Sequence, residues 1–197
     1  MTHVLTANQL KGRAIGALFF TGFGTLWLML GLYLCERLSI GAVFGVLLVA
    51  TGLTAAALNL MSHARRFPRV TEDARRKRMF YWIDGGQYVA IFLVLTTLNK
   101  RHLEVYDVTA IAAIVAVHLF PLAWVFQNKM HYATGGTLLL WLTGTVFFVP
   151  AQQLQGMTAL GTGVILWLAA AITLVRHSLT ARHASLLART VMRLPES

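Results

Sequence analysis

Apolar residues fill six long runs of this chain, and polar segments separate the runs. The runs span residues 14–35, 40–61, 79–98, 106–126, 134–150 and 158–175. Each contains ~17–22 residues, enough for a helix rising 1.5 Å per residue to cross about 30 Å of hydrocarbon. Backbone amides in lipid must bond within their own segment, which makes these runs helices. The pattern therefore predicts an all-α polytopic membrane protein with six transmembrane helices.

The connections between the runs predict which helices are neighbours. Short connections follow the first, third, fourth and fifth runs, so each of these runs should form an antiparallel hairpin with the next one. Small residues four positions apart indicate where helices approach closely in lipid. Such pairs are Gly12 with Gly16 and Gly41 with Gly45, and Gly161 and Gly163 can serve the sixth run.

The composition of the chain supports the membrane class. Its 197 residues are 57% apolar and 12% charged, with a mean hydropathy of +0.65. Charges are therefore too few to coat a soluble globule of this size. The single cysteine, Cys35, excludes an intramolecular disulfide and a four-cysteine metal site.

Lysine and arginine residues are distributed unevenly among the polar segments. With the N-terminus in the cytoplasm, the inner segments hold 14 of the 17 and the outer loops hold 3. This positive-inside pattern predicts that both termini are cytoplasmic. The formal charge of +10 then reflects topology and contact with anionic lipid. Nucleic-acid binding is not expected, because no aromatic or loop pattern for base recognition accompanies the basic residues.

The connection between the second and third runs is the longest polar one, with the sequence HARRFPRVTEDARRKR from His63 to Arg78. A solvated basic loop that lies against lipid is one interpretation. A docking site for a phosphoinositide-like headgroup or an acidic partner is the other. The candidate headgroup ligands are Arg65, Arg66, Arg75 and Arg76.

The residues after the last run have the periodicity of a basic amphipathic helix. Its apolar positions are Leu179, Leu186, Leu187, Val191 and Leu194. Arg182, Arg189 and Arg193 fall away from them. We expect this helix to lie in the inner headgroup region, with Arg182 and Arg189 as headgroup ligands, whereas an oligomer contact is the alternative. The chain thus divides into a transmembrane domain, 1–175, and a cytoplasmic tail, 176–197.

The fourth run carries a titratable ring at a depth where membrane helices are usually apolar. In the stretch IAAIVAVHLFPLAWVF, His118 lies near the middle and Pro121 follows one turn later. Pro121 frees a carbonyl of the preceding turn and predicts a helix kink. Because intramembrane ionisable residues are candidates for functional sites, His118 can line a proton or ion path. A buried histidine that only bonds to neighbouring helices is the alternative.

The third run begins with FYWIDGGQY, which places Asp84 and Gln87 one turn apart on one helix face. Counted from the ends of their runs, Asp84 lies ~8 Å deep, and Gln87 and His118 both lie ~12 Å deep. A hairpin joins the two runs, so we predict that Asp84 and His118 come within hydrogen-bond or one-water reach in the bundle interior, with Gln87 beside them. An ion pair with Arg78 is the alternative for Asp84. Asn59, at the end of the second run, is a weaker candidate for the same cluster.

The segment HLFPLAWVFQNKMHYATGG resembles the signature of an uncharacterised family of small bacterial six-helix membrane proteins, a domain of unknown function. In that family a helix with His-x-x-Pro-x-x-Trp is followed, after a short loop, by Tyr-x-x-x-Gly. The matching positions are His118, Pro121, Trp124, Tyr132 and Gly136. Gly86 and Gln87 of the third run are also similar. The resemblance implies a location in the bacterial cytoplasmic (inner) membrane, and it implies no activity.

The sequence carries no pattern of an enzyme or of a cofactor site. His118 is the only histidine well inside a run, so a paired-histidine haem site is not expected. No nucleophile elbow, HExxH motif or pair of intramembrane carboxylates is present. We therefore expect no enzyme activity, no cofactor and no metal site.

Two classes of function remain. The first is a small transporter or channel for a small solute, an ion or a proton, with a polar path near Asp84, Gln87 and His118. The second is a scaffold or accessory subunit of a larger complex, in which polar residues only join helices. Either class is compatible with a homo-oligomer or with a partner membrane subunit. A polar cavity that reaches His118 favours transport, and a sealed core favours the scaffold.

Overall fold

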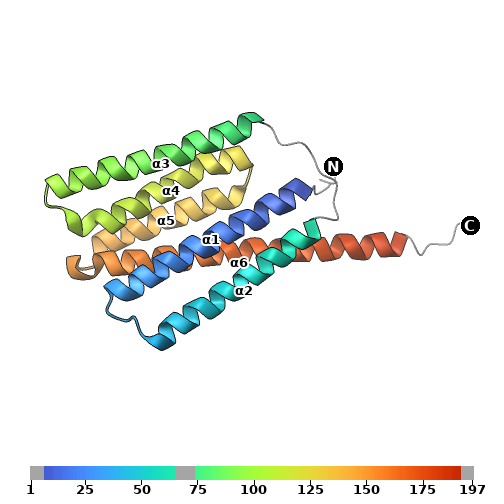
Figure 1. The fold of residues 1–197 in the computed structure, drawn as a ribbon, viewed down its shortest axis with the longest axis horizontal. Coiled ribbons are helices and arrows are strands. Elements are labelled where there is room, and N and C mark those ends of the chain that lie inside the picture. Colours follow the sequence, from blue (N-terminus) through green and yellow to red (C-terminus); the bar gives the residue numbers. More distant parts are fainter. Residues whose placement is uncertain (1–6, 65–73, 192–197) are drawn as a thin grey trace, which may run out of the picture.

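The computed structural model describes residues 7–64 and 74–191, and the side chains of residues 11–63, 75, 78–176 among them. Within these residues the chain is all-α, with six α-helices and one short 3-10 helix, and no strand (Figure 1). The helices are α1 (Ala7–Leu34), α2 (Ile40–Ala64), α3 (Ala74–Lys100), η1 (Glu104–Tyr106), α4 (Asp107–Phe126), α5 (Lys129–Phe148) and α6 (Ala151–Val191).

Five of these helices are long and apolar enough to cross a membrane, as the helices of an integral membrane protein are. The five segments are Lys11–Leu34, Ile40–His63, Arg78–Lys100, Glu104–Phe126 and Ala151–Arg176. The remaining helix, α5, forms where the fifth run predicts one. Its first half, KMHYATGG, is polar or small, and α5 is not among the five segments that are apolar enough to cross a membrane.

The helices pack as a row of antiparallel hairpins (Figure 1). The central pair is α1 with α6; α2 lies against both on one side, and α4 and α5 lie against α6 on the other. The outermost helix, α3, packs on α4 and η1, and within the described residues it makes no contact with α2. The four predicted hairpins are therefore confirmed, because each of the short connections joins two helices in contact.

Close approach of α1 and α6 is possible because glycines lie between them. A Cβ on Gly31 would come within 2.6 Å of the Leu160 backbone nitrogen, and one on Gly163 within 2.8 Å of the Gly24 carbonyl oxygen. Gly163 thus packs as predicted. Gly161 also does so, because the Trp141 ring occupies the space where its side chain would be.

The glycine pairs at the other predicted positions do not mediate helix packing. A Cβ added at Gly12, Gly16, Gly41 or Gly45 would meet nothing within 4 Å. The prediction for these four residues is therefore wrong. Spacing alone does not tell which face of a helix points at a neighbour, and these glycines lie on faces turned away from the bundle.

The last helix is longer than the sixth apolar run. It continues without a break from Ala151 to Val191 and projects past the rest of the bundle (Figure 1). The predicted amphipathic tail, 176–197, is thus helical as far as Val191 and joined directly to the transmembrane part. Its side chains lie outside those that the structure describes, so its contact with lipid stays a prediction.

The two ends of the bundle differ in charge. At the end where α1, α3 and α5 begin, the described charged residues are Lys11, Arg13, Arg75, Arg78, Lys129 and Arg176. At the opposite end they are Glu36, Arg37, Lys100, Arg101, Glu104 and Asp107. We call these the basic end and the far end. The described charged groups at the basic end itself are all cationic, and the carboxylate of Asp84 lies farther along α3, whereas the far end is mixed.

Candidate functional site

The candidate site lies where α3 packs on α4, near the basic end. His118 of α4 is half-buried, and its ring is close enough to Asp84 of α3 to interact electrostatically with the carboxylate. The ring also lies near the backbone of Ile83. His118 therefore lies at the contact of α4 with α3. Among the described residues no hydrogen bond or ion pair joins it to Asp84, so their predicted hydrogen-bond or one-water contact stays a prediction.

One face of α3 carries the site toward α4. Phe80, Ile83, Asp84 and Gln87 are half-buried and recur at helical spacing, whereas the neighbouring Trp82 is exposed. The register is fixed at the basic end, where the ring centroids of Phe80 and Phe126 lie 5.8 Å apart. Gln87 is on the same face as Asp84, as its spacing predicts.

The alternative partner of Asp84 is not beside it. Arg78 is exposed and makes no ion pair with Asp84 among the described residues. The ion pair found in this part of the chain joins His102 to Glu104 at the far end. The His118 imidazole is close enough to Asp84 to interact with it electrostatically, although the two do not form an ion pair.

A second histidine, His131, joins the site from α5, and the sequence analysis did not identify it. His131 is 8% exposed and lies close enough to His118 for the two rings to interact electrostatically. Its ring packs against Phe20 of α1 at a centroid distance of 5.3 Å and against Phe126 of α4 at 6.3 Å. Its Nδ1 atom is buried and makes no hydrogen bond within the described residues.

The start of α5 explains how His131 comes to be buried. Asn128 caps the helix by accepting a hydrogen bond from the Met130 amide at 3.1 Å, which places His131 in the first turn. The connection from α4 has only two residues, so this turn folds back against the last turns of α4. The sequence signal that could have indicated His131 is Asn128, a residue typical of a helix N-cap, three positions before it. It was missed because His131 precedes the fifth apolar run.

The surroundings of His131 are apolar. Phe20 and Phe126 lie around its ring, and its Nδ1 has no hydrogen-bond partner among the described residues. A neutral imidazole of this kind can accept a proton or donate a hydrogen bond to a neighbouring group.

The other predicted site residues lie away from this cluster. Asn59 is exposed on α2, which contacts neither α3 nor α4 among the described residues, so it does not belong to the cluster. Pro121 lies inside α4, which stays helical from Asp107 to Phe126; the predicted kink is not a break of the helix. Arg75 is exposed near the basic end. The remaining headgroup candidates, whose side chains lie outside the described ones, are Arg65, Arg66, Arg76, Arg182 and Arg189.

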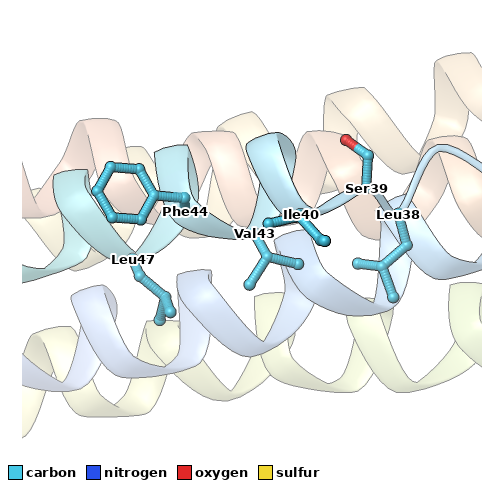
Figure 2. Close-up of a pocket in the computed structure, with 6 residues that line it drawn as sticks. All are labelled: Leu38, Ser39, Ile40, Val43, Phe44 and Leu47. Atoms are coloured by element: carbon cyan, nitrogen blue, oxygen red, sulfur yellow. The ribbon is translucent and has the colours of Figure 1, made fainter.

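Two shallow apolar hollows lie on the surface, apart from the candidate site. One is lined by Leu38, Ser39, Ile40, Val43, Phe44 and Leu47 at the start of α2 (Figure 2). The other is lined by Ile15, Leu18, Phe19, Gly22, Phe23 and Leu26 of α1. Both are open and apolar, as expected of surfaces that face lipid, and neither includes a residue of the Asp84–His118–His131 cluster.

The cluster offers groups that exchange protons. One carboxylate and two imidazoles come from three different helices, and His118 is close enough to both of the others to interact with them electrostatically. Among the described residues, no three His, Cys, Asp or Glu side chains are grouped as a metal site requires.

No protein-family model, curated protein or solved structure matches the chain. The resemblance of the segment from His118 to Gly136 to an uncharacterised family stays a prediction. It rests on the matching residues alone.

Proposed function

We propose that the chain is a small membrane transporter or channel that binds a proton or another small cation between Asp84 and His118. The observation that carries the proposal is the position of His118, which lies close enough to Asp84 of α3 and to His131 of α5 to interact electrostatically with both. Gln87 lies on the same face of α3 as Asp84 and completes the polar surface.

The chemistry of the pair explains why it suits this role. An isolated charge inside the hydrocarbon costs at least ~2.5–3.5 kcal/mol, so intramembrane ionisable groups pair with one another or face water. Asp84 and His118 together are neutral when they share one proton. When this proton leaves, the pair has a charge of −1, which another proton or a bound small cation neutralises. Such a pair binds a proton without holding it permanently, which a transport site requires.

The proposed orientation places the basic end in the cytoplasm. The described charges at that end are all cationic, in agreement with the positive-inside rule, and with six crossings both termini lie on that side. The sixth crossing is α5, whose 20 residues are long enough to span when packed against α4 and α6. Labelling of single cysteines from each side tests this orientation. Placement of residues 65–78 outside the cytoplasm would overturn it.

Anionic lipid is the proposed partner of the basic end. Each lysine or arginine near an anionic surface contributes about 1 kcal/mol to binding. The predicted headgroup ligands of the long connection and of the tail, Arg75 and Arg182 among them, would then hold this end against the inner leaflet of a bacterial cytoplasmic membrane. Headgroup binding needs no cofactor and no nucleic acid.

A non-transporting accessory subunit is the second candidate. It is favoured by α3, which packs on α4 and η1 and has no buried residue among its described side chains. Its exposed surface carries Tyr81, Trp82, Tyr88 and Phe92. A helix attached so loosely can pack against a partner membrane protein or a second copy as readily as against lipid.

Proton flux in liposomes tests the proposal directly. The purified chain is reconstituted around a pH-sensitive dye, and a potassium gradient with valinomycin drives proton entry. We expect His118→Ala to lower the flux to that of protein-free liposomes, because the ring connects Asp84 with His131. His102→Ala is the matched control, since His102 is exposed at the far end.

Two results would decide against transport. In the first, His118→Ala carries protons as fast as the unchanged protein. In the second, the unchanged protein adds no flux under proton, sodium or potassium gradients. The accessory-subunit function would then stand.

A further inference from the structure

A row of buried hydroxyl groups crosses three helices in the half of the bundle near the far end. The hydroxyl oxygens of Thr109 in α4 and Thr158 in α6 are 3.2 Å apart. Thr158 donates to the hydroxyl of Thr145 in α5 at 3.4 Å, and Thr145 donates to the Leu142 carbonyl at 2.9 Å. A hydroxyl has a single proton, so these bonds run in one direction, from Thr109 to Thr158 to Thr145.

Thr162, one turn below Thr158 on α6, has no partner although it is fully buried. Buried threonines elsewhere in the bundle donate to the carbonyl four residues earlier; Thr21, Thr134 and Thr173 do so at 2.7–2.8 Å. Thr162 is 0% exposed, and its hydroxyl makes no hydrogen bond within the described residues. Its own helix therefore does not satisfy it, which is unusual for a buried hydroxyl.

Trp141 of α5 has a similar unsatisfied group at the same depth. Its indole ring packs on Gly161, the residue before Thr162, and its Nε1 is buried without a hydrogen-bond partner among the described residues. Trp167 shows the usual arrangement, because its Nε1 lies 3.2 Å from the Thr21 carbonyl and 3.3 Å from the Thr25 hydroxyl. Within the described residues the Trp167 indole is thus hydrogen-bonded, whereas the Trp141 indole is not.

Asp107 adds an acceptor at the far end of the same three helices. It is the first residue of α4, where the helix dipole favours a carboxylate, and its Oδ1 is buried and makes no hydrogen bond within the described residues. We define the polar seam as Asp107, Thr109, Trp141, Thr145, Thr158 and Thr162. Three of its groups have no partner among the described residues: the Asp107 Oδ1 acceptor, the Trp141 N–H donor and the Thr162 hydroxyl, which can donate and accept. Water suits such a set because each molecule can donate two hydrogen bonds and accept two.

A buried apolar layer separates the polar seam from His118. Ala116 of α4, Leu138 of α5 and Leu166 of α6 are 0–2% exposed. Ala116 and Leu138 lie between the seam and the histidines of their own helices, and Leu166 follows Thr162 by one turn on α6. A polar region, an apolar layer and a second polar region therefore follow one another through the α4–α5–α6 contact.

We propose that the polar seam binds water and forms the far-end half of a path to His118, with Ala116, Leu138 and Leu166 as its closed barrier. The assignment of a path rests on the proposed function, whereas the binding of water does not. The ligand is water or a hydrated proton, which matches hydroxyl, indole and carboxylate groups without a dedicated metal cage.

Cysteine reactivity tests for water in the seam. Thr158→Cys and Thr162→Cys are made in a Cys35→Ser background, placed in lipid nanodiscs that leave both membrane faces open, and treated with a small cationic methanethiosulfonate. Leu168→Cys, on the lipid-facing side of the same helix, is the matched control. Thiolates form in water and not in hydrocarbon, so we expect at least one seam cysteine to react ~10-fold faster than the control.

The outcomes separate this inference from the proposed function. Seam cysteines that react no faster than Leu168→Cys, in protein that elutes as a single species on gel filtration, would overturn the inference. Isosteric Thr162→Val gives a second test: the variant should melt at or below the temperature of the unchanged protein, whereas a higher melting temperature would indicate a dry, unsatisfied hydroxyl. Fast labelling together with a full flux in His118→Ala would retain the hydrated seam and reject the proton site.

Discussion

The contact between α1 and α6 and the contact between α3 and α4 are built from different kinds of residue. Glycines bring α1 and α6 so close that added Cβ atoms at Gly31 or Gly163 would touch backbone atoms. In contrast, α3 meets α4 with half-buried side chains, and two of these, Asp84 and Gln87, are polar. The first contact is a rigid frame, whereas the second is a loosely packed surface that carries the ionisable residues. Functional residues commonly lie on the less stable elements of a protein.

The largest expected effect comes from disrupting the close contact between α1 and α6. Gly31→Val places a branched side chain where a Cβ alone would come within 2.6 Å of the Leu160 nitrogen. Backbone cannot move aside as a flexible side chain can, so we expect a loss of about 3 kcal/mol, the upper end of the usual overpacking cost. Unfolding in mixed detergent and SDS micelles measures this loss.

The matched control lies on α2. Gly45→Val adds the same side chain to a helix position with nothing within 4 Å. Equal destabilisation by the two substitutions would show that close packing of α1 on α6 is not what stabilises the frame.

The sequence pattern predicted the helices and their hairpins better than it predicted which helix faces are packed and which residues form the candidate site. The apolar runs gave every helix, and the short connections gave the hairpins, because hydrocarbon thickness and backbone satisfaction leave few other solutions. Glycine spacing did not give the packed faces: Gly163 lies between helices, but Gly12 and Gly41 face away. Which face of a helix meets a neighbour depends on tertiary packing, which a four-residue spacing does not specify.

Depth counting placed Asp84 and His118 together because both lie on one hairpin and at similar distances from its basic end. The same counting could not include His131, which belongs to the next hairpin and to a first turn with no apolar signal. It also could not exclude Asn59, since the positions of α2 and α3 relative to each other depend on the long connection between them. The structure separates these two helices within the described residues.

A double-mutant cycle on Asp84 and His118 is the most direct test of the account, because the proposed site needs these side chains to interact. Free energies of unfolding are measured at pH 7 for the unchanged protein, Asp84→Asn, His118→Gln and the double variant. We predict a coupling energy on the order of 1 kcal/mol, and the same cycle with His102→Gln should be additive. A coupling within error of zero between Asp84 and His118 would contradict the account, since the two residues would then be neighbours without an interaction.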